Sequence, residues 1–560
     1  MSRPTLADIR PGDRIAGAPF AGRSVVWGAG GAAATAHPLA TLTAIDILRA
    51  GGSAVDAAIA ANACLGLMEP TGCGIGGDVF ALIWDPRARA VAGLNGSGRS
   101  PRNLSLQIQR ERALDGRIAR NGAASVSVPG AVDGWWMAHQ RFGRLPWKAL
   151  LEPAIALCEA GAPIPQTIAV QWRANVAALL ADPRIEETAN LKALHLAEEA
   201  TPGEGRLFRN PDLARAYRLI AEGGRGAFYE GEIAEAIEAY FRRIGGWMDR
   251  EDLRAHAGEW TAPLSTGYRG VEVFGLGPNT QGLTTLQMLN ILKWFDLGEA
   301  GFLSARSLHL QAEAKRLAFE DRARRFADPA FAAVPVEELL SEDHAARQAA
   351  RIRLDRPIAE AGRARAPGHG DTTCVCAADA DGMMVSLLQS NFRGLGSGLV
   401  PDGLGFMLQN RGELFALQDG HPNLYAPAKR PFHTVIPGFA LKGGAPWLAF
   451  AVMGGDMQPQ GQAQIVTALM DHGLGLQEAG DAPRWRHEGS SDPAGGAAAG
   501  AGVLHLERGV PRAVRAELEA LGWRLGPSDG GFGGYQAILR GPAAYGAASE
   551  MRKDGLGLAY

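Results

Sequence analysis

The sequence predicts a layered α+β fold in which helices cover an antiparallel sheet. The first observation is that residues 104–260 have mostly helical patterns. The second is a change from helical to strand patterns after residue 372. Short strand patterns follow one another there at 373–378, 383–389, 447–453, 503–506 and 535–539. The third is that the chain is 46% hydrophobic and 21% charged over 560 residues, which is ordinary globular usage. A helix-rich first part and a strand-rich second part favour helices packed on sheet faces.

Composition excludes several classes of partner. The formal net charge is −3, from 56 basic and 59 acidic residues, so no basic surface for nucleic acid or an anionic membrane is expected. We see neither a secretory signal nor an apolar run of about 18 residues, and we expect a cytoplasmic protein. We expect no cofactor, and no metal, because the twelve histidines are scattered. The five cysteines do not form a disulfide framework: Cys64, Cys73, Cys158, Cys374 and Cys376.

The first elements are a pair of helices. Residues 1–35 are expected to be irregular, and a helix is predicted over residues 39–49. Ser53 and Asp56 have the spacing of a capping box, and residues 54–68 follow as a second helix. This second helix is apolar nearly all round, which predicts that it is buried.

A glycine-rich segment follows at residues 72–77, and it matches the pattern G-x-G-x-x-G. The dinucleotide fingerprint follows a strand and opens a helix. Here a helix precedes the glycines and a strand over residues 79–85 follows them, so nucleotide binding is discounted. The glycines are better explained by close approach of the backbone to another element.

Further helices are predicted over residues 284–294 and 308–324, with a loop at 276–282 between them and the preceding strands. The stretch 363–370 is a polar linker directly upstream of Thr372, where a chain can be cut without disrupting a core.

Thr372 opens a predicted hairpin. Residues 372–378 form one strand, 379–382 a turn and 383–389 the return strand, which brings Ser390 within reach of Thr372. A threonine hydroxyl is a weak nucleophile without a base. If the Asp371–Thr372 bond were cut, the new α-amine of Thr372 would lie beside its own hydroxyl and serve as that base. The alternative is a surface hairpin that happens to begin with two threonines.

Two glycines form a second candidate site. The strand 448–453 ends at Gly454 and Gly455, and a helix is expected to begin near Gln462. Consecutive glycines after a strand let backbone N–H groups point at one spot, where they can hold a developing oxyanion. The alternative is a tight strand-to-helix turn.

A polar loop after the return strand lies where a substrate would meet Thr372. It contains Arg393, and the next loop ends in Gln409-Asn410-Arg411-Gly412. Arg393 and Arg411 can each bind a carboxylate through two hydrogen bonds, or either can be a solvated surface arginine.

Together these residues resemble the γ-glutamyltranspeptidase family of N-terminal nucleophile hydrolases, from about Gly30 to Tyr560. The resemblance includes residues 51–58, 268–270, 286–290, 314–328 and 545–549. It implies a four-layer αββα fold made as a single-chain precursor. Self-cleavage between Asp371 and Thr372 would give a helix-rich large fragment, 1–371, and a small fragment, 372–560. The fragments would stay together as one globular heterodimer. The resemblance does not decide whether heterodimers assemble into a higher oligomer.

The resemblance also implies an acyl-transfer cycle. Thr372 attacks an amide carbonyl, Gly454 and Gly455 hold the oxyanion, and water or an amine releases the acyl group. Ser390 aligns with the family's second hydroxyl residue, which hydrogen-bonds the amine of the nucleophile.

Most of the family's α-amino-acid recognition set is missing. Ser97 falls where the family has the arginine for the α-carboxylate, and Phe392 where it has an asparagine. Leu414 replaces the acidic residue for the α-amine, Arg411 a glutamine, and His433-Thr434 a pair of serines. An ammonium group would meet Leu414 and Arg411, which is unfavourable for a free γ-glutamyl group.

The resemblance therefore favours the divergent branch, similar to glutaryl-cephalosporin acylases and oxamate amidohydrolases. We expect an amidase for small acids that lack the α-amine. The expected substrate-binding residues are Arg411, Asn410, Arg393, His433, Arg99 and Ser97. One alternative is a genuine γ-glutamyl transferase or glutathione hydrolase. Another is an uncleaved, non-catalytic scaffold, whose signature would be loss of Thr372 or of the glycine pair, and both are present.

Overall fold

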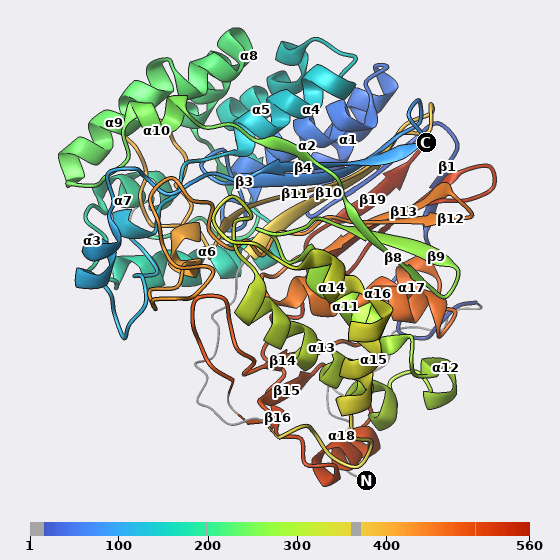
Figure 1. The fold of residues 1–560 in the computed structure, drawn as a ribbon. Coiled ribbons are helices and arrows are strands. Elements are labelled where there is room, and N and C mark those ends of the chain that lie inside the picture. The colour runs from blue at the N-terminus through green and yellow to red at the C-terminus, as the bar shows by residue number, and fades with distance from the viewer. Residues whose placement is uncertain (1–15, 198, 360–370, 499) are drawn as a thin grey trace, which may run out of the picture.

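A computed structural model describes residues 16–197, 199–359, 371–498 and 500–560, and two large antiparallel sheets form its centre (Figure 1). The first sheet has seven strands in the order β1 (Val26–Gly28), β18 (Tyr545–Ser549), β17 (Tyr535–Arg540), β13 (Ala445–Val452), β12 (Gly438–Lys442), β9 (Val271–Gly275) and β8 (Leu264–Tyr268). The second has seven in the order β19 (Leu556–Ala559), β2 (Ala32–Thr35), β10 (Asp371–Ala378), β11 (Met384–Phe392), β3 (Asp78–Asp85), β4 (Ala90–Gly96) and β7 (Glu259–Thr261).

The two sheets share an apolar core. Cys374 and Cys376 of β10 pack in one cluster with Phe439 of β12 and Ala449 of β13. Val375, the residue between the two cysteines, belongs instead to the cluster formed with the helices. Side chains of a strand alternate between its faces, so β10 is buried on both. All residues of β10 after Asp371 are buried, which places Thr372 inside the molecule rather than at its surface.

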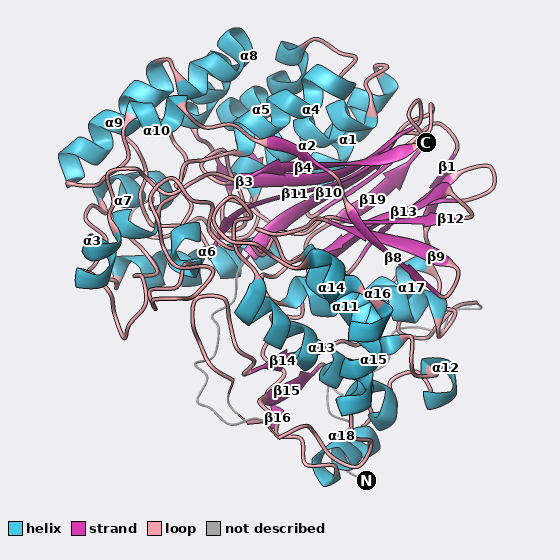
Figure 2. Cartoon of the chain, viewed as in Figure 1, coloured by secondary structure: helices cyan, strands magenta, loops and turns pink. Residues whose placement is uncertain are grey.

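One group of helices covers the second sheet (Figure 2). The innermost is α2 (Ala54–Met68), in which every residue is buried, and the Ser53–Asp56 capping box opens it as predicted. Its many alanines let it lie close to β10. The group also contains α1 (Pro38–Arg49), α4 (Ala131–Phe142), α5 (Trp147–Ala160), α8 (Pro211–Tyr229) and α9 (Glu232–Ile244). Shorter elements join them: α3 (Leu106–Glu111), α6 (Gln166–Leu180), α7 (Ala189–His195), α10 (Arg250–Arg254) and the strands β5 (Ala162–Pro163) and β6 (Leu207–Phe208).

A second group of helices packs against the first sheet, in the core that contains Leu286, Leu317, Phe450 and Val466. Its main members are α11 (Gly282–Leu292), α13 (Ala305–Arg325) and α16 (Met457–Met470). Around them lie α12 (Leu297–Ala300), α14 (Val336–Leu340), α15 (Glu342–Arg351), α17 (Leu476–Asp481), α18 (Arg512–Ala520) and the small sheet of β14 (Trp485–Glu488), β15 (Val503–Leu506) and β16 (Leu525–Gly526).

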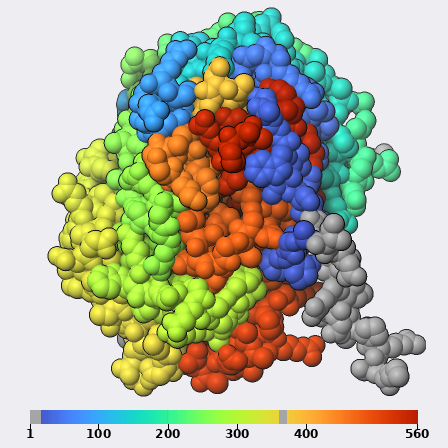
Figure 3. All heavy atoms as spheres, turned by 90° about the vertical axis from the view of Figure 1, so that its right-hand side faces the viewer, coloured from blue at the N-terminus to red at the C-terminus, as the bar shows by residue number. Residues whose placement is uncertain are grey.

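The first two strands of the described chain lie beside its last two. β1 pairs with β18, and β2 pairs with β19. Figure 3 shows the early, blue segments against the late, red ones on one face. Among the described residues, no helix has the length and apolar character needed to cross a bilayer.

Two predicted boundaries were wrong. The described part of residues 1–35 is not all irregular, because β2 lies inside the second sheet between β19 and β10. Its sequence Ala-Ala-Ala-Thr has no alternation, so only its sheet partners make it a strand. The helix after the glycine pair begins at Met457 instead of near Gln462. Pro459 is tolerated there because the first turn of a helix needs no intrahelical N–H donors. The predicted linker 363–370 lies outside the described residues.

Candidate active site

Thr372 is held against the peptide bond that precedes it. Its hydroxyl donates to the Asp371 carbonyl oxygen at 2.7 Å, and its own N–H donates to Asp371 Oδ1 at 2.9 Å. The register between β10 and β11 shifts between Asp371 and Thr373, so Thr372 falls at an irregularity of the ladder. The predicted hairpin is present, and it places the Thr372 hydroxyl beside the carbonyl of the peptide bond that precedes it.

Ser390 approaches the same carbonyl from β11. Its hydroxyl donates to the Asp371 oxygen at 2.7 Å and accepts from the Phe392 N–H at 2.8 Å. In this uncut chain Ser390 therefore contacts the Asp371 carbonyl rather than the Thr372 nitrogen. Two hydroxyl groups thus converge on one backbone oxygen, and the Ser390 hydroxyl can stabilise negative charge on it.

A buried lysine fixes the side chain of Asp371. Lys553 Nζ donates to Asp371 Oδ1 at 2.8 Å and to Glu69 Oε1 at 2.9 Å. Burial alone would lower the pKa of Lys553, but the Asp371 and Glu69 carboxylates outweigh it and raise that pKa. Burial raises the pKa of Glu69 to about 7, against the opposing effect of Lys553. The residue before Thr372 is thus held by an ion pair with a buried lysine.

Gly454 and Gly455 form the turn between β13 and α16. Their φ values are 107° and 59°, in the left-handed region that favours glycine. Within the described part of the chain, neither N–H donates to a protein acceptor. The same turn reaches the nucleophile through Gln458, whose Nε2 donates to Thr372 Oγ1 at 3.3 Å. The turn therefore presents two available donors close to the threonine hydroxyl.

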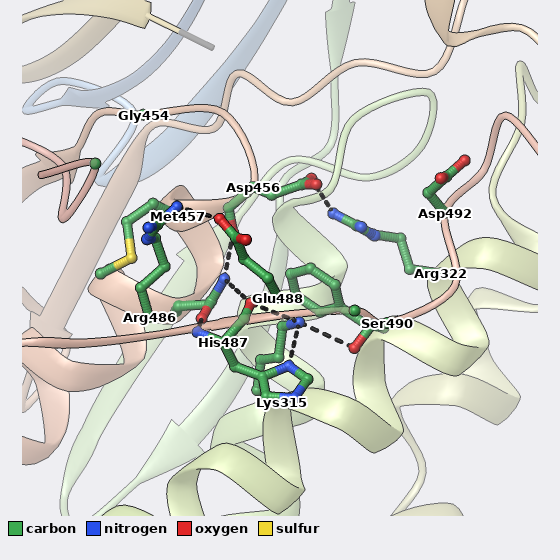
Figure 4. Close-up of a pocket in the computed structure, with 14 residues that line it drawn as sticks. Lys315, Arg322, Gly454, Asp456, Met457, Arg486, His487, Glu488, Ser490 and Asp492 are labelled. Atoms are coloured by element: carbon green, nitrogen blue, oxygen red, sulfur yellow. Dashed lines mark hydrogen bonds and ion pairs between the residues drawn. The ribbon is translucent and has the colours of Figure 1, made fainter. Parts of the chain in front are cut away.

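Three side chains brace this turn from behind. Gln281 Nε2 donates to the Gly455 carbonyl at 2.9 Å and to the Thr434 carbonyl at 2.7 Å. Arg322 Nη1 donates to Gln281 Oε1 at 2.5 Å and to Asp456 Oδ1 at 2.6 Å. Figure 4 shows Arg322 pointing to Asp456 across a small chamber that Gly454 also lines, with buried Lys315 directed at His487 and Ser490. Sequence analysis did not single out Gln281, Arg322 or Gln458, because no local pattern marks them.

Arg411 lies in the interior beside the hydroxyl pair. Its Nη2 donates to Ser390 Oγ at 3.3 Å and its Nη1 to Thr434 Oγ1 at 2.8 Å. The guanidinium carbon lies 4.1 Å from the centre of the Phe392 ring. Burial lowers the pKa of Arg411 to about 9. Its fully covered position is not that of a solvated surface arginine.

His433 is buried and directed away from the nucleophile. Its Nε2 donates to Asp78 Oδ2 at 3.1 Å, because its Nδ1 accepts from the Val435 N–H. Burial, and then the charge of Arg411, lower the pKa of His433 well below its usual range, so the ring is neutral. Burial also raises the pKa of Asp78 to about 7. His433 contributes structure here through Asp78 and offers no positive charge to a carboxylate.

The remaining predicted substrate-binding residues form two groups, one near the site and one without a hydrogen bond to it in the described part of the chain. Arg393 is ion-paired with Glu413, and Asn410 links the two loops by accepting from the Arg393 N–H at 3.1 Å. Ser97 is buried and its hydroxyl donates to Asn95 Oδ1 at 2.7 Å. The Arg99 side chain donates to the Ala257 carbonyl at 3.5 Å. The structure brings Arg393 and Asn410 near the site, whereas Ser97 and Arg99 make no hydrogen bond to Thr372, Ser390 or the glycine turn among the described residues.

Two cavities open beside the site. One of about 580 Å³ is lined by Asp371, Lys553, Met453 and Gly454. The other, of about 330 Å³, is lined by Arg393, Leu414, Phe432 and Asp456, among others. In the described part of the chain, no group of three or more histidine, cysteine or acidic side chains is arranged to hold a metal ion.

Similarity to known proteins agrees with this geometry. The chain is 37% identical to the glutathione hydrolase-like YwrD proenzyme of Bacillus subtilis, over 80% of this chain and 83% of that protein. It is 34% identical to the acylase ACY 1 proenzyme of Pseudomonas sp. SE83, over 94% and 93%. It is 32% identical to the oxamate amidohydrolase proenzyme of Klebsiella pneumoniae, over 95% and 98%.

The fold agrees as well. The crystal structure of cephalosporin acylase from Bacillus halodurans superposes with a TM-score of 0.88 at 36% identity, covering 98% of this chain and 99% of that one. The family described as gamma-glutamyltranspeptidase matches residues 40–560. This chain belongs to the γ-glutamyltranspeptidase family.

Proposed function

We propose that this protein is an amide hydrolase and acyltransferase that cuts itself between Asp371 and Thr372 and then uses Thr372 as an N-terminal nucleophile. The observation that carries the proposal is the hydrogen bond of 2.7 Å from the Thr372 hydroxyl to the Asp371 carbonyl oxygen. Relatives named as proenzymes support self-cleavage. The two face-to-face sheets between two groups of helices support the four-layer αββα arrangement of N-terminal nucleophile hydrolases.

In self-cleavage, Thr372 Oγ attacks the Asp371 carbonyl carbon. Negative charge develops on the oxygen to which Ser390 donates. The C–N bond then breaks, the nitrogen takes up a proton and becomes the α-amine, and Asp371 remains joined to Thr372 Oγ as an ester. Water hydrolyses this ester and leaves a carboxylate at the new end of the large fragment. Asp371 and Thr372 are thus the two sides of the first amide that the site breaks.

In turnover, the freed α-amine accepts the proton of Thr372 Oγ as this oxygen attacks the substrate amide. The N–H groups of Gly454 and Gly455 point toward the developing oxyanion and stabilise it by about 3 kcal/mol per donor. The amine returns the proton to the leaving nitrogen. Water, or an acceptor amine, then attacks the acyl-enzyme and releases the acid or the transfer product. The brace formed by Gln281, Arg322 and Asp456 keeps the glycine turn in place during these steps.

The substrate class follows from what stands around the nucleophile. Leu414 and Phe392 offer no acceptor for an ammonium group, and the cations Arg393 and Arg411 lie close by. A free γ-glutamyl α-amine would be desolvated there beside these cations, and the nearby carboxylate of Glu413 is already ion-paired with Arg393. We infer that the acyl group carries a carboxylate and lacks the α-amine, as in glutaryl or oxamyl amides. The names of the acylase and oxamate amidohydrolase relatives support this choice.

A second candidate is a genuine glutathione hydrolase, favoured by the relative named glutathione hydrolase-like. Initial rates on γ-glutamyl and glutaryl 4-nitroanilides separate the two, because these substrates differ only in the α-amine. We expect the glutaryl compound to be preferred. A strong preference for the γ-glutamyl compound would sink the assignment of substrate class but leave the nucleophile untouched.

Intact mass and N-terminal sequencing test the proposal directly. We expect wild-type protein to give two chains, the second of which begins at Thr372, and Thr372→Ala to stay whole at about 59 kDa. A wild-type chain that stays whole after long incubation would favour a non-catalytic scaffold.

A further inference from the structure

The cavity of about 330 Å³ contains an arginine that sequence analysis did not single out. We propose that Arg120 binds the carboxylate of the acyl group in this cavity, so that the preferred substrates are amides of short dicarboxylic acids with an apolar stem. This inference rests on the proposed function and names the residue that selects its substrate class.

The cavity begins beside both halves of the site. Arg393 follows Phe392, and Phe392 is the register partner of Asp371 across the hairpin. Asp456 follows Gly455 of the glycine turn. Arg393 and Asp456 both line the cavity. An acyl group attached to Thr372 Oγ therefore has this space within reach of its far end.

The charges around the cavity are balanced except at Arg120. Three of its four arginines are ion-paired: Arg117 with Asp492, Arg184 with Asp182, and Arg393 with Glu413. The Arg120 side chain makes no hydrogen bond or ion pair to any described residue. Arg120 is an exposed residue of the cavity lining, and partial burial of its guanidinium, followed by the charge of nearby Arg393, lowers its pKa. A bound carboxylate would offset the repulsion between these two cations, and the guanidinium can hold it through two parallel hydrogen bonds.

Several apolar side chains of the lining fit an apolar stem, and its acidic members Glu413, Asp456 and Asp492 are each ion-paired with an arginine. Leu414 and Phe432 belong to one small apolar cluster with Phe392, and they face the cavity together with Leu114, Ile118 and Ala494. Methylene groups gain from leaving water against these apolar side chains, whereas an ammonium group there would compete with arginines for carboxylates that are already ion-paired. The combination selects a chain of methylene groups that ends in a carboxylate.

Arg411 is the other candidate for binding the substrate carboxylate, and its surroundings argue against that role. It is fully covered, it donates to the Ser390 and Thr434 hydroxyls, and it lies against the Phe392 ring. It is absent from the lining of both cavities beside the site. Arg411 thus already has two hydroxyl partners, whereas Arg120 lines the cavity of about 330 Å³.

Kinetics on matched amides test the proposal. We would measure kcat/KM for glutaryl 4-nitroanilide, butyryl 4-nitroanilide and the butyryl amide of 4-aminobenzoate, with Arg120→Ala, Arg120→Lys and Arg306→Ala. Arg306 is an exposed residue of α13 outside the cavity. We expect Arg120→Ala to lower the glutaryl-to-butyryl ratio ~10-fold to ~100-fold, mainly through KM, because a lost hydrogen bond to a charged group has that effect. Arg120→Lys should fall between, and Arg306→Ala should match the wild type.

An unchanged ratio in Arg120→Ala would overturn the proposal. So would selective loss on the aminobenzoate amide, which would place the bound carboxylate on the leaving group. Calorimetric binding of glutarate to the same variants gives a readout without turnover: it should weaken in Arg120→Ala and persist in Arg306→Ala, and equal binding in both would refute the site. If the wild-type chain stays uncut and inactive, the proposed function fails, and glutarate binding alone decides the role of Arg120.

Discussion

At the residue scale, Lys553 holds the side chain of Asp371, whose peptide bond to Thr372 is the proposed site of self-cleavage. Lys553→Met removes the donor that Asp371 and Glu69 share. The two carboxylates then lie close without a cation, and loss of one partner of a buried pair costs about 3–5 kcal/mol. We expect self-cleavage to slow at least ~10-fold, since Asp371 loses the contact that fixes it beside Thr372.

A time course of fragment formation on denaturing gels, with thermal unfolding beside it, measures this effect. Lys148→Met, at an exposed position of α5, is the control. Lys553→Arg should restore part of the rate because it keeps the charge. If Lys553→Met were cleaved at the wild-type rate, Asp371 would be positioned by the backbone alone.

Asp78 gives the fold a pH dependence. Burial raises its pKa to about 7, above the value of about 3.9 in an unfolded chain. The folded state then binds the proton more tightly, so Asp78 stabilises the fold fully below about pH 4, and this stability is lost as the pH rises through 7. We expect the unfolding free energy of Thr372→Ala protein to fall between pH 5 and pH 7. With Asp78→Asn added, that fall should be smaller by about 2 kcal/mol. Urea titrations at several pH values measure it, and an unchanged slope would contradict it.

At the element scale, the strand-to-helix turn separates self-cleavage from turnover. The Asp371 carbonyl is contacted by the hydroxyls of Thr372 and Ser390, whereas the proposed role of the glycine turn is to hold the substrate oxyanion. Gly454→Ala forces an L-residue into φ 107°, and its Cβ would approach Met457 and Gly533 at 3.3 Å. We expect the chain still to cut itself while kcat falls ~10²-fold to ~10³-fold, as for loss of an oxyanion donor.

The control is Gly443→Ala, in the hairpin between β12 and β13. Gly443 has φ 58° and open space around it, so alanine there carries backbone strain without touching the site. Both variants should lose similar stability, and only Gly454→Ala should lose activity. Equal activity losses would mean that strain, not oxyanion geometry, is responsible.

Elements that depend on neighbouring residues were predictable from the sequence, whereas elements and contacts that depend on distant residues were not. Helix α2 and the β10–β11 hairpin were predictable because capping, periodicity and turn residues act within a few positions. β2 was missed because four small residues become a strand only between two partners that are distant in sequence. The glycine pair was visible in the sequence, but Gln281 and Arg322 reach it from 174 and 134 positions away. Such contacts leave no local pattern, and neither does the burial of Arg411 under Phe392.

At the scale of the whole molecule, each large sheet interleaves strands from both sides of residue 371. In the first sheet, β1 and β9 precede the cut and pair with β18 and β12, which follow it. In the second, β2 pairs with both β10 and β19, and β3 pairs with β11. Separation of the fragments would unpair all five of these ladders and expose the core between the sheets.

We therefore expect the cut protein to behave as one cooperative unit. Fragments 1–371 and 372–560 should co-elute on size exclusion in native buffer and part only in denaturant. The urea transition of the cut protein should be single and coincide for tryptophan fluorescence and far-ultraviolet circular dichroism. Its midpoint should lie near that of uncut Thr372→Ala, because the cut removes one covalent link and none of the five ladders. Release of a folded small fragment below the transition would contradict this picture, since β10 and β11 would then have to persist without β2 and β3.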